Sequence, residues 1–412
     1  MPDEAAPSPG RDVVLVVSDL QSGGAQRVVA TLANAWAQCG CRVTVVTLDG
    51  DESDFFALDS GVERRRLGLA GRSRSALDAA AANWRRIGTL RRAIRRAGAP
   101  VVVSFVAATN VLAVLATFGL AVRLVICERN DPRRQRLGGP WDWLRRRLYR
   151  HADLVTANSR EALDAMRAYV PAEKLRALPN PLAITGKGDG SRSGSATILS
   201  VGRLDQQKGY DILLDAFARS SARQAGWQLA IVGEGALRGD LKRQADRLGL
   251  GEQLEWRGLS AELTDHYANA GIFVMASRHE GMPNVVLEAM AMGRPVIVTD
   301  RCGGALDYVT AGESGLVVPA ENARALAEAI DRLASDPALR SRLGAAARQA
   351  VAACRLERVM PLWDEAIAWS GQAARLAPDE AAARGQGSPS LPSNSNQQSQ
   401  CDANSATTGR LG

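Results

Sequence analysis

The chain has 412 residues, enough for two domains of ~150–200 residues each, and 46% of them are hydrophobic, which allows a sizeable core in both. The net charge is +7, but residues 1–182 carry 27 Lys/Arg against 18 Asp/Glu, whereas the rest of the chain is near neutral. Six cysteines fit no zinc-ligand spacing and only three histidines are present, which argues against a structural zinc site and for a reducing compartment.

The first 182 residues predict one α/β domain. A buried strand at 13–17 (VVLVV), a glycine-containing loop and a helix at 25–38 lead into a strand at 42–48, which is a β-α-β unit typical of a Rossmann-like domain. Further apolar runs are predicted to be strands of the same parallel sheet, at 101–106, 122–127 and 153–157. We therefore expect a basic, Rossmann-like domain over 1–182.

One uncharged segment, 97–122, is long enough to span a bilayer. Pro100 starts a short β-branched run within it, and polar residues such as Thr109 interrupt it. The segment is therefore predicted to be a buried strand followed by an Ala/Leu helix.

The second half repeats the strand-helix alternation. A Gly/Ser-rich stretch at 183–196 is predicted to be a linker, and 197–354 is predicted to form a second doubly wound parallel sheet. The polar segment 371–412 lacks apolar periodicity, which predicts a disordered tail. The expected fold class is α/β, with two Rossmann-like doubly wound domains.

Ligands of open α/β sheets bind beyond the carboxyl ends of the strands, so the residues that follow each strand of the second sheet form the candidate site. Its first strand is followed by Arg203 and Lys208, two cations that could hold a diphosphate and stabilise it as it leaves. The next strand ends in a turn with Gly233 and Glu234, where glycine lets backbone approach a ligand closely. Each feature alone is equally compatible with surface charge or an ordinary turn.

The stretch HEGMPNVVLEAM places two carboxylates around a helix start. Pro283 suits the first turn of a helix, and the N–H groups of Asn284 and Val285 would then face an anion at the positive end of the helix dipole. Glu280 precedes this helix and Glu288 lies within it, so one can accept hydrogen bonds from a sugar and the other from a ribose. A helix cap plus a surface glutamate is the alternative. Together with the neighbouring loops, the stretch predicts a pocket for a nucleotide diphosphate that carries a polyol.

Several motifs resemble those of family 4 of the glycosyltransferases, the large retaining group with two facing Rossmann-like domains, the GT-B fold. The matching segments, in order and at the usual spacing, are LSVGRLDQQKGYDILLDAF, VGEG, SRHEGMPNVVLEAMAMGRPVIVTD and GESGLVVP, with SGGAQRV as a looser match near the N-terminus. The resemblance covers nearly all of residues 12–369. It also implies that 1–182 is the acceptor domain, that 197–354 is the nucleotide-sugar donor domain, and that residues 355–370 include a helix crossing back to the first domain.

The resemblance implies roles by position. Arg203, Lys208 and Glu280 would form the catalytic group, with the two cations on the donor diphosphate and the glutamate on the transferred sugar. Glu288 would bind the donor ribose. The donor-binding set implied in this way is Gly23, Gly24, Arg203, Lys208, Gly233, Glu234, Glu280, Met282, Pro283, Asn284, Val285 and Glu288. Neither a metal, another cofactor nor a protein nucleophile is implied, because retaining members are understood to use front-face attack assisted by the donor phosphate.

On the acceptor side the chain departs from its relatives. Many carry a histidine after the fourth strand, where this chain has Phe105, so polar Ser104 and Asn110 are the candidates to replace it. The segment CERNDPR resembles a loop of members that build bacterial cell-surface polysaccharides and lipid-linked glycans, which adds Glu128, Arg129 and Asn130 as acceptor-side candidates. Ordinary hydrogen bonding within the loop is the alternative.

Two arginine-rich segments of the first half carry tryptophans. NWRRIGTLRRAIRRAG at 83–98 puts Trp84, Ile87, Leu90 and Ile94 on one helical face, and a second cluster follows Trp141 and Trp143. Basic helices with tryptophan suit an anionic membrane surface, while a core-facing stripe with a solvated arginine face is the alternative. Nothing resembles a base-reading module, so nucleic acid is not an expected partner.

The leading hypothesis is a retaining glycosyltransferase that moves a hexose or N-acetylhexosamine from a nucleotide sugar, with a UDP-sugar favoured, to a growing glycan or polyprenyl-linked acceptor. A cytoplasmic location is expected, with peripheral attachment to the inner face of the plasma membrane left open. The alternatives are a nucleotide-sugar epimerase of the same fold and a non-catalytic membrane-associated scaffold. A NAD(P) oxidoreductase is disfavoured, because the first loop reads SGGAQR where a G-x-G-x-x-G fingerprint is needed.

Overall fold

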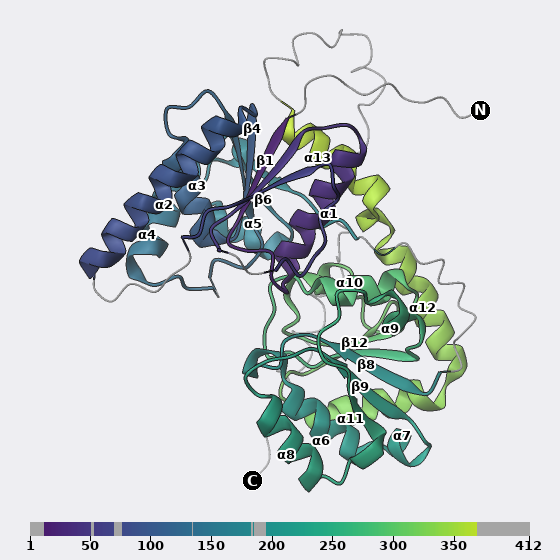
Figure 1. The fold of residues 1–412 in the computed structure, drawn as a ribbon. Helices are drawn as coiled ribbons and strands as arrows, with labels where there is room; N and C mark the ends of the chain where they lie inside the picture. Colours follow the sequence, from purple (N-terminus) through teal and green to yellow (C-terminus); the bar gives the residue numbers. More distant parts are fainter. Residues whose placement is uncertain are drawn as a thin grey trace, which may run out of the picture. The chain divides into compact units, whose positions relative to one another are not determined.

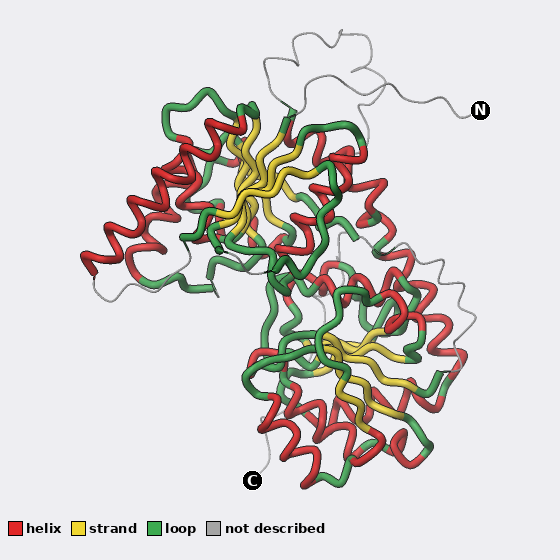
Figure 2. The backbone as a smooth tube through the Cα atoms, in the orientation of Figure 1, coloured by secondary structure: helices red, strands yellow, loops and turns green. Residues whose placement is uncertain are grey.

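The computed structural model describes residues 12–50, 53–69, 76–133, 135–182, 184 and 195–368, which build two parallel sheets with helices on both faces of each (Figure 1). Figure 2 shows the strands of each sheet enclosed by helices, as expected for doubly wound α/β architecture. The predicted tail at 371–412 and most of the predicted linker at 183–196 lie outside the described residues.

The first sheet has the order β3-β2-β1-β4-β5-β6-β7, and all its strand pairs are parallel. Its strands are β1 (Val13–Val17), β2 (Val43–Thr47), β3 (Val62–Arg66), β4 (Val101–Phe105), β5 (Arg123–Glu128), β6 (Leu154–Ala157) and β7 (Leu175–Ala177). The predicted strands are confirmed to within a residue or two. The two edge strands, β3 and β7, are additional to the prediction, because one is mostly charged and the other is only three residues long.

Helices cover both faces of this sheet. They are α1 (Gly24–Gln38), α2 (Ala76–Ala97), α3 (Ala107–Thr117), α4 (Gly139–Leu148), α5 (Arg160–Met166) and, from far along the chain, α13 (Leu356–Ile367). In β1, alternate residues serve two separate cores: Leu15 packs in the core that contains α1 and α13, and Val16 in the core that contains α2 and α3. This two-sided burial explains why β1 reads as a continuous apolar run.

The second sheet has the order β10-β9-β8-β11-β12-β13, again with parallel pairs. Its strands are β8 (Thr197–Val201), β9 (Gln228–Val232), β10 (Leu254–Trp256), β11 (Ile272–Met275), β12 (Val296–Thr299) and β13 (Leu316–Val318). Its helices are α6 (Tyr210–Arg219), α7 (Ser221–Gln224), α8 (Arg238–Arg247), α9 (Thr264–Ala268), α10 (Asn284–Ala291), α11 (Ala323–Ser335) and α12 (Pro337–Ala350).

Each sheet has one point where the strand order reverses. In the first sheet this point lies between β1 and β4, and in the second it lies between β8 and β11. The loops that leave neighbouring strands diverge at such a point and open a crevice, which is where open α/β sheets bind ligands.

The uncharged segment 97–122 is confirmed as a strand and a helix, since β4 and α3 account for most of it. None of the helices in the described part of the chain combines the length and hydropathy needed to cross a bilayer.

Trp363 anchors α13 in the first sheet's core. Its ring stacks on Phe105 with 6.0 Å between centroids and meets Trp36 edge-on at 6.3 Å. The guanidinium carbon of Arg129 lies 5.1 Å from the Trp363 ring centroid and 5.4 Å from that of Phe105, so this cation contacts both aromatic rings. A residue near the end of the described chain thus completes the core begun by β1.

Candidate active site

Glu280 follows β11 and is held by side chains from two loops. Lys208 Nζ lies 2.7 Å from its Oε1, which also accepts a 2.5 Å hydrogen bond from Ser277 Oγ. Gln207 Nε2 donates to its Oε2 at 3.3 Å. The lysine is in place because Asp205 caps the short turn Gln206–Lys208, accepting from Lys208 N. With a side chain only 6% exposed, Glu280 is a fixed acceptor paired with a cation.

The helix α10 begins at Asn284, one residue after Pro283, as the sequence predicts. The Asn284 side chain donates through Nδ2 to the carbonyl of Gly24 at 3.2 Å, and its Oδ1 accepts from Asn180 Nδ2 at 2.6 Å. The amide side chain is thereby committed to α1 and to the segment 178–182 (LPNPL). No side chain caps the N-terminus of this helix, and its first residues, Asn284 and Val285, line the adjoining cavity, where the positive end of the helix dipole favours an anion.

Glu288, one turn into α10, is 2% exposed and has two partners. Tyr267 donates its hydroxyl to Oε2 at 2.8 Å, and Arg27 Nε from α1 lies 3.3 Å from Oε1. Burial, together with the neighbouring Glu288 charge, holds the pKa of Tyr267 well above its ordinary value, so this residue stays a hydrogen-bond donor. Glu288 is therefore a hydrogen-bond acceptor of fixed orientation. Its Oε2 is held by Tyr267, and its Oε1 contacts Arg27 from α1.

Gly233 is required by the close approach of two strand ends. Its φ is +152°, and a Cβ there would lie 1.9 Å from the carbonyl oxygen of Gly202. No other residue fits that position without moving the β8 loop, which carries Arg203.

These residues surround one cavity of about 710 Å³. All but one of the predicted donor-binding residues line it: Gly23, Gly24, Arg203, Lys208, Gly233, Glu280, Met282, Pro283, Asn284, Val285 and Glu288. The exception is Glu234, which pairs with Arg238 four residues later and is not among the lining residues. Arg203 is 64% exposed and paired with Asp205 at 3.3 Å, so its guanidinium lies at the solvent side of the cavity.

The predicted acceptor-side residues divide into two groups. Arg129 and Asn130 line the cavity, whereas Ser104, Asn110 and Glu128 are fully buried and line neither cavity described in this article. The structure thus corrects the acceptor contacts predicted for these three, because their side chains lie inside the first domain.

The side chain of Glu128 belongs to a buried hydrogen-bond network and does not form part of a binding surface. Its Oε2 accepts from the Tyr149 hydroxyl at 3.0 Å, and that hydroxyl also accepts from Asn110 Nδ2 at 3.2 Å. Burial raises the pKa of Glu128 above its ordinary 4.5, and it raises the pKa of Tyr149 well above 10.0. The network ties β5 and α3 to the turn Tyr149–His151 that follows α4, and it adjoins the loop that carries Asn130.

Sequence reasoning missed several residues of the cavity wall. Arg27 follows the predicted glycine pair by one helical turn, which places it on the same side of α1. Asn180 lies in LPNPL, a segment predicted only to precede the linker, and Gln207 precedes Lys208. The spacing from a predicted residue was the available signal for two of them. Nothing in the local pattern marks Asn180, because its role depends on meeting Asn284 across 104 positions.

Within the described residues, no group of three or more His, Cys, Asp or Glu side chains is arranged to hold a metal ion.

Comparison with known proteins gives a family for both halves of the chain. Residues 187–350 match the family described as glycosyl transferases group 1, and residues 23–181 match the glycosyl transferase 4-like domain. The two matches fall on the second and the first sheet, respectively.

Among curated relatives, an α-1,4-N-acetyl-D-galactosaminyltransferase of Campylobacter jejuni, named for a saccharide on PP-undecaprenol, is 26% identical over 86% of this chain and 98% of its own length. An exopolysaccharide phosphotransferase of Streptomyces coelicolor is 33% identical over 47% of this chain, which spans only 21% of that protein.

Among solved structures, the Anabaena protein HepE in complex with UDP and glucose matches with a TM-score of 0.69 and 19% identity, over 86% of this chain and 98% of that one. The likeness confirms the predicted fold, with two Rossmann-like domains. Since each half also matches its own family model, the chain belongs to family 4 of the glycosyltransferases and is a glycosyltransferase of the GT-B fold.

Proposed function

We propose that the protein is a retaining hexosyl- or N-acetylhexosaminyltransferase that uses a nucleotide sugar, with UDP-sugars favoured, to extend a lipid-linked or polysaccharide glycan. The observation that carries this proposal is the convergence, in one cavity, of the Lys208–Glu280 pair, the free N-terminus of α10 and Glu288. In this proposal the helix N-terminus and Lys208 bind the diphosphate, Glu280 binds the transferred sugar, and Glu288 binds the ribose.

The diphosphate would lie between the α10 N-terminus and the two cations. Backbone N–H groups at Asn284 and Val285 supply uncommitted donors, and Arg203 and Lys208 supply positive charge. In this proposal these groups balance the charge that develops on the leaving diphosphate, and no metal ion is invoked.

The transferred sugar would hydrogen-bond to Glu280. Its two carboxylate oxygens already accept from lysine, serine and glutamine, which fixes their direction. A sugar hydroxyl would add a further donor to a carboxylate that does not need to reorient.

The ribose hydroxyls would hydrogen-bond to Glu288. Arg27 lies at Oε1 of this carboxylate, while Tyr267 holds Oε2. Ribose binding would therefore replace the Arg27 contact and leave the Tyr267 contact in place. In this proposal, Arg27 contacts Glu288 when the ribose site is empty and leaves it when ribose binds.

The reaction would proceed on one face of the sugar. The bond from the anomeric carbon to the diphosphate oxygen breaks, and a bond from the acceptor hydroxyl oxygen to the same carbon forms. The acceptor proton passes to the departing diphosphate, so no side-chain nucleophile is needed. The choice of UDP is supported by the UDP-bound structural neighbour, and the lipid-linked acceptor by the name of the Campylobacter relative.

A surface with exposed aromatic side chains supports the proposal of a lipid-linked acceptor. Among the described residues, three of the four exposed large hydrophobic side chains are Trp84 on α2, Phe118 after α3 and Trp143 on α4, at 74%, 72% and 59% exposure. These helices are neighbours, and exposed arginines such as Arg95 and Arg147 lie on them. We name Trp84, Phe118 and Trp143 the exposed aromatic patch. Aromatic side chains beside arginines suit attachment to the anionic inner face of the plasma membrane, from the cytoplasm.

Nucleotide binding tests the proposal directly. Calorimetry with UDP, GDP, ADP and TDP should find one diphosphate that binds, and Glu288→Ala should weaken it. Product analysis by NMR should then find the donor's anomeric configuration retained. Binding of none of the four nucleotides, or full transfer activity in folded Glu280→Ala and Lys208→Ala variants, would overturn the proposal.

A further inference from the structure

A second cavity, of about 460 Å³, opens at the carboxyl edge of the first sheet. Its walls come from the residues that follow β1, β2 and β4, together with α2, α3 and α4. This is the point between β1 and β4 where the strand order reverses, the expected ligand position in such a sheet. We call it the N-terminal cavity. No residue that the preceding sections placed in the donor site lines it.

The polar wall of this cavity contains a carboxylate oxygen without a donor. Asp49, directly after β2, is 5% exposed, and its Oδ2 has no hydrogen-bond partner. An unpaired buried carboxylate oxygen costs stability, so its persistence at a cavity wall points to a ligand that donates to it. Asp19, after β1, adds a second carboxylate, which accepts from Ser18 Oγ at 2.6 Å.

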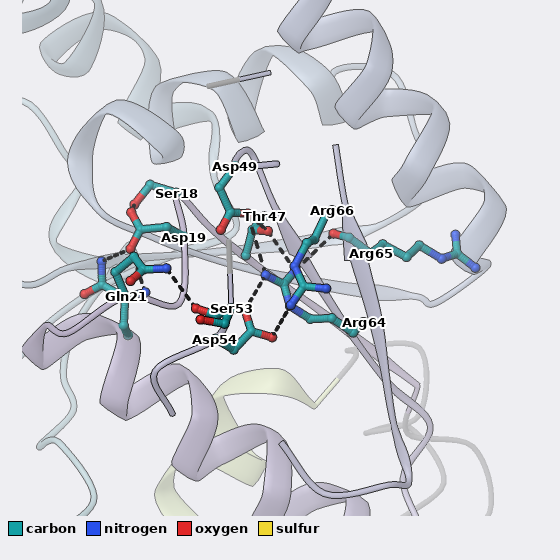
Figure 3. Close-up of polar contacts among 11 residues, drawn as sticks. Ser18, Asp19, Gln21, Thr47, Asp49, Ser53, Asp54, Arg64, Arg65 and Arg66 are labelled. Atoms are coloured by element: carbon teal, nitrogen blue, oxygen red, sulfur yellow. Dashed lines mark hydrogen bonds and ion pairs between the residues drawn. The ribbon is translucent and has the colours of Figure 1, made fainter. Parts of the chain in front are cut away.

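The other oxygen of Asp49 is held by a network of polar side chains (Figure 3). Thr47 Oγ1 donates to Oδ1, and Arg64 NH2 lies 3.6 Å from it. Arg64 is itself held by Asp54 through two hydrogen bonds of 2.9 Å. The charged edge strand β3 thus supplies the cation that orients Asp49 and leaves Oδ2 for another partner.

The lining also includes apolar side chains and one aromatic ring. Leu112 comes from α3 and Trp141 from α4, and Val106 lines both this cavity and the donor cavity. One cation, Arg86 of α2, lines the cavity as well, but its guanidinium donates to the Leu69 carbonyl and to Asn83 Oδ1. Two carboxylates against this one engaged arginine disfavour a phosphate or diphosphate, and a hydrocarbon chain has no hydrogen to donate to Asp49. A neutral sugar suits both parts of the lining, because its hydroxyls donate to carboxylates while its C–H face packs on a ring.

The N-terminal cavity adjoins the donor cavity. Val106 lines both, and its φ of +75° is an unusual conformation for a β-branched residue, of the kind retained at functional positions. Asp19 Oδ1 also accepts from Gln26 Nε2 at 3.1 Å, and Gln26 lines the donor cavity. A sugar bound here would lie next to the end of the donor site.

We propose that the N-terminal cavity binds one neutral sugar unit of the acceptor and that Asp49 is its specificity-determining residue. This inference rests on the proposed function, because it names an acceptor subsite of that reaction. It assigns the site to the cavity lined by Asp19, Asp49 and Trp141, in place of the buried residues that follow β4 and β5.

The test uses saturation-transfer NMR on the full chain with UDP present. The probes are methyl α-glycosides of glucose, galactose, mannose, N-acetylglucosamine and N-acetylgalactosamine. We expect at least one to bind, and Asp49→Asn to weaken it about tenfold. Ala108→Leu, which adds bulk at a lining position and leaves both carboxylates in the sequence, should weaken it as strongly. The control Asp59→Asn changes a carboxylate that accepts from Gln38 outside the cavity and should leave binding unchanged.

The outcomes separate this inference from the proposed function. UDP affinity should be the same in wild type, Asp49→Asn and Ala108→Leu, and failure of UDP to bind wild type counts against the proposed function. If UDP binds but no glycoside does, or if Ala108→Leu binds glycosides like wild type, the acceptor subsite is wrong. If Asp49→Asn does not fold, glycoside binding by Ala108→Leu alone decides whether the N-terminal cavity is the acceptor subsite.

Discussion

At the scale of single residues, the donor cavity depends on carboxylates whose direction is fixed before a ligand arrives. Glu280 has lysine, serine and glutamine donors, and Glu288 has tyrosine and arginine. Such pre-oriented groups lower the cost of organising a transition state, because the protein does not have to rearrange when the substrate binds.

Glu280→Gln should reduce kcat/KM about 100-fold, equivalent to about 2.7 kcal/mol, because Lys208 loses its buried counter-charge and the sugar loses a charged acceptor. Steady-state transfer kinetics would measure this, with melting temperature as the check on folding. The matched control is the exposed Glu252→Gln, for which wild-type kinetics are expected. An equal loss in both variants would contradict a specific role for Glu280.

Glu288→Ala and Arg27→Ala should separate in a nucleotide-binding experiment. The first removes the proposed ribose acceptor and should weaken UDP about tenfold, or about 1.4 kcal/mol. The second removes a side chain that ribose would displace, so UDP affinity should not fall. Calorimetry on both variants measures the contrast, and equal weakening would refute displacement of Arg27.

Glu128→Gln should change how stability depends on pH. Burial raises the pKa of Glu128 in the folded state, so the folded protein keeps a proton that the unfolded chain releases above about 4.5. Stability from this group is therefore lost as pH rises from that value through the raised pKa. The urea concentration at the unfolding midpoint, measured from pH 5 to 8, should rise in Glu128→Gln relative to wild type as the pH increases. The exposed Glu173→Gln should follow wild type throughout.

At the scale of elements, the sequence pattern predicts buried strands well and edge strands poorly. The runs that became β1, β2 and β4 are apolar on both faces, since helices cover both sides of the sheet. The strand β3 reads VERRR and gives no such signal; its arginines take their partners from the loop after β2. Long-range ion pairs of this kind have no local sequence pattern.

The candidate site was predictable where its residues follow strands in order. Glu280, Lys208 and Glu288 could be placed because the carboxyl ends of parallel strands meet at one edge. Ser104 and Glu128 could not, since a polar residue at a strand end can face either the cleft or the core. Here both face the core.

The face predicted for α2 illustrates the same limit. Leu90 and Ile94 are buried as the period predicts, but Trp84 is 74% exposed. The buried residues of α2, among its described side chains, all lie in its second half, where the helix packs on the sheet. Helical periodicity identifies the apolar face of a helix, but it does not show how far along the helix that face is covered by the sheet.

Trp84→Ala and Trp143→Ala should each weaken binding to phosphatidylglycerol-containing vesicles about fivefold, because each removes about 1 kcal/mol of buried apolar contact. Vesicle co-sedimentation measures this. Leu259→Ala, an exposed large hydrophobic outside the exposed aromatic patch, serves as the control and should bind like wild type. Unchanged binding in both tryptophan variants would remove the patch from the proposed function.

At the scale of the whole molecule, the chain closes on itself through α13. The Trp36 indole N–H donates to Asp364 at 2.9 Å across 328 positions of sequence, and Trp363 fills the space between α1, β4 and Arg129. The first sheet's core is thus built from both ends of the described chain.

Trp363→Ala should lower the free energy of unfolding by about 3–5 kcal/mol, because it empties a fully buried aromatic position and exposes Arg129 to a cavity. Thermal and urea unfolding would measure the loss. The exposed Trp143→Ala should change stability by less than about 0.5 kcal/mol. A small effect at Trp363 would mean that α13 contributes little to the first core.

The position of α13 also has a consequence during synthesis. A ribosome delivers the first sheet early, but the helix that covers its α1 face comes only after the whole second sheet has been translated. Until then, Phe105 and Trp36 lack their largest partner and that apolar face is open to other nascent chains or to chaperones. Nascent chains that end between residues 319 and 355 should accordingly bind a chaperone such as trigger factor longer than chains that extend past residue 368, even though both contain the strands of both sheets.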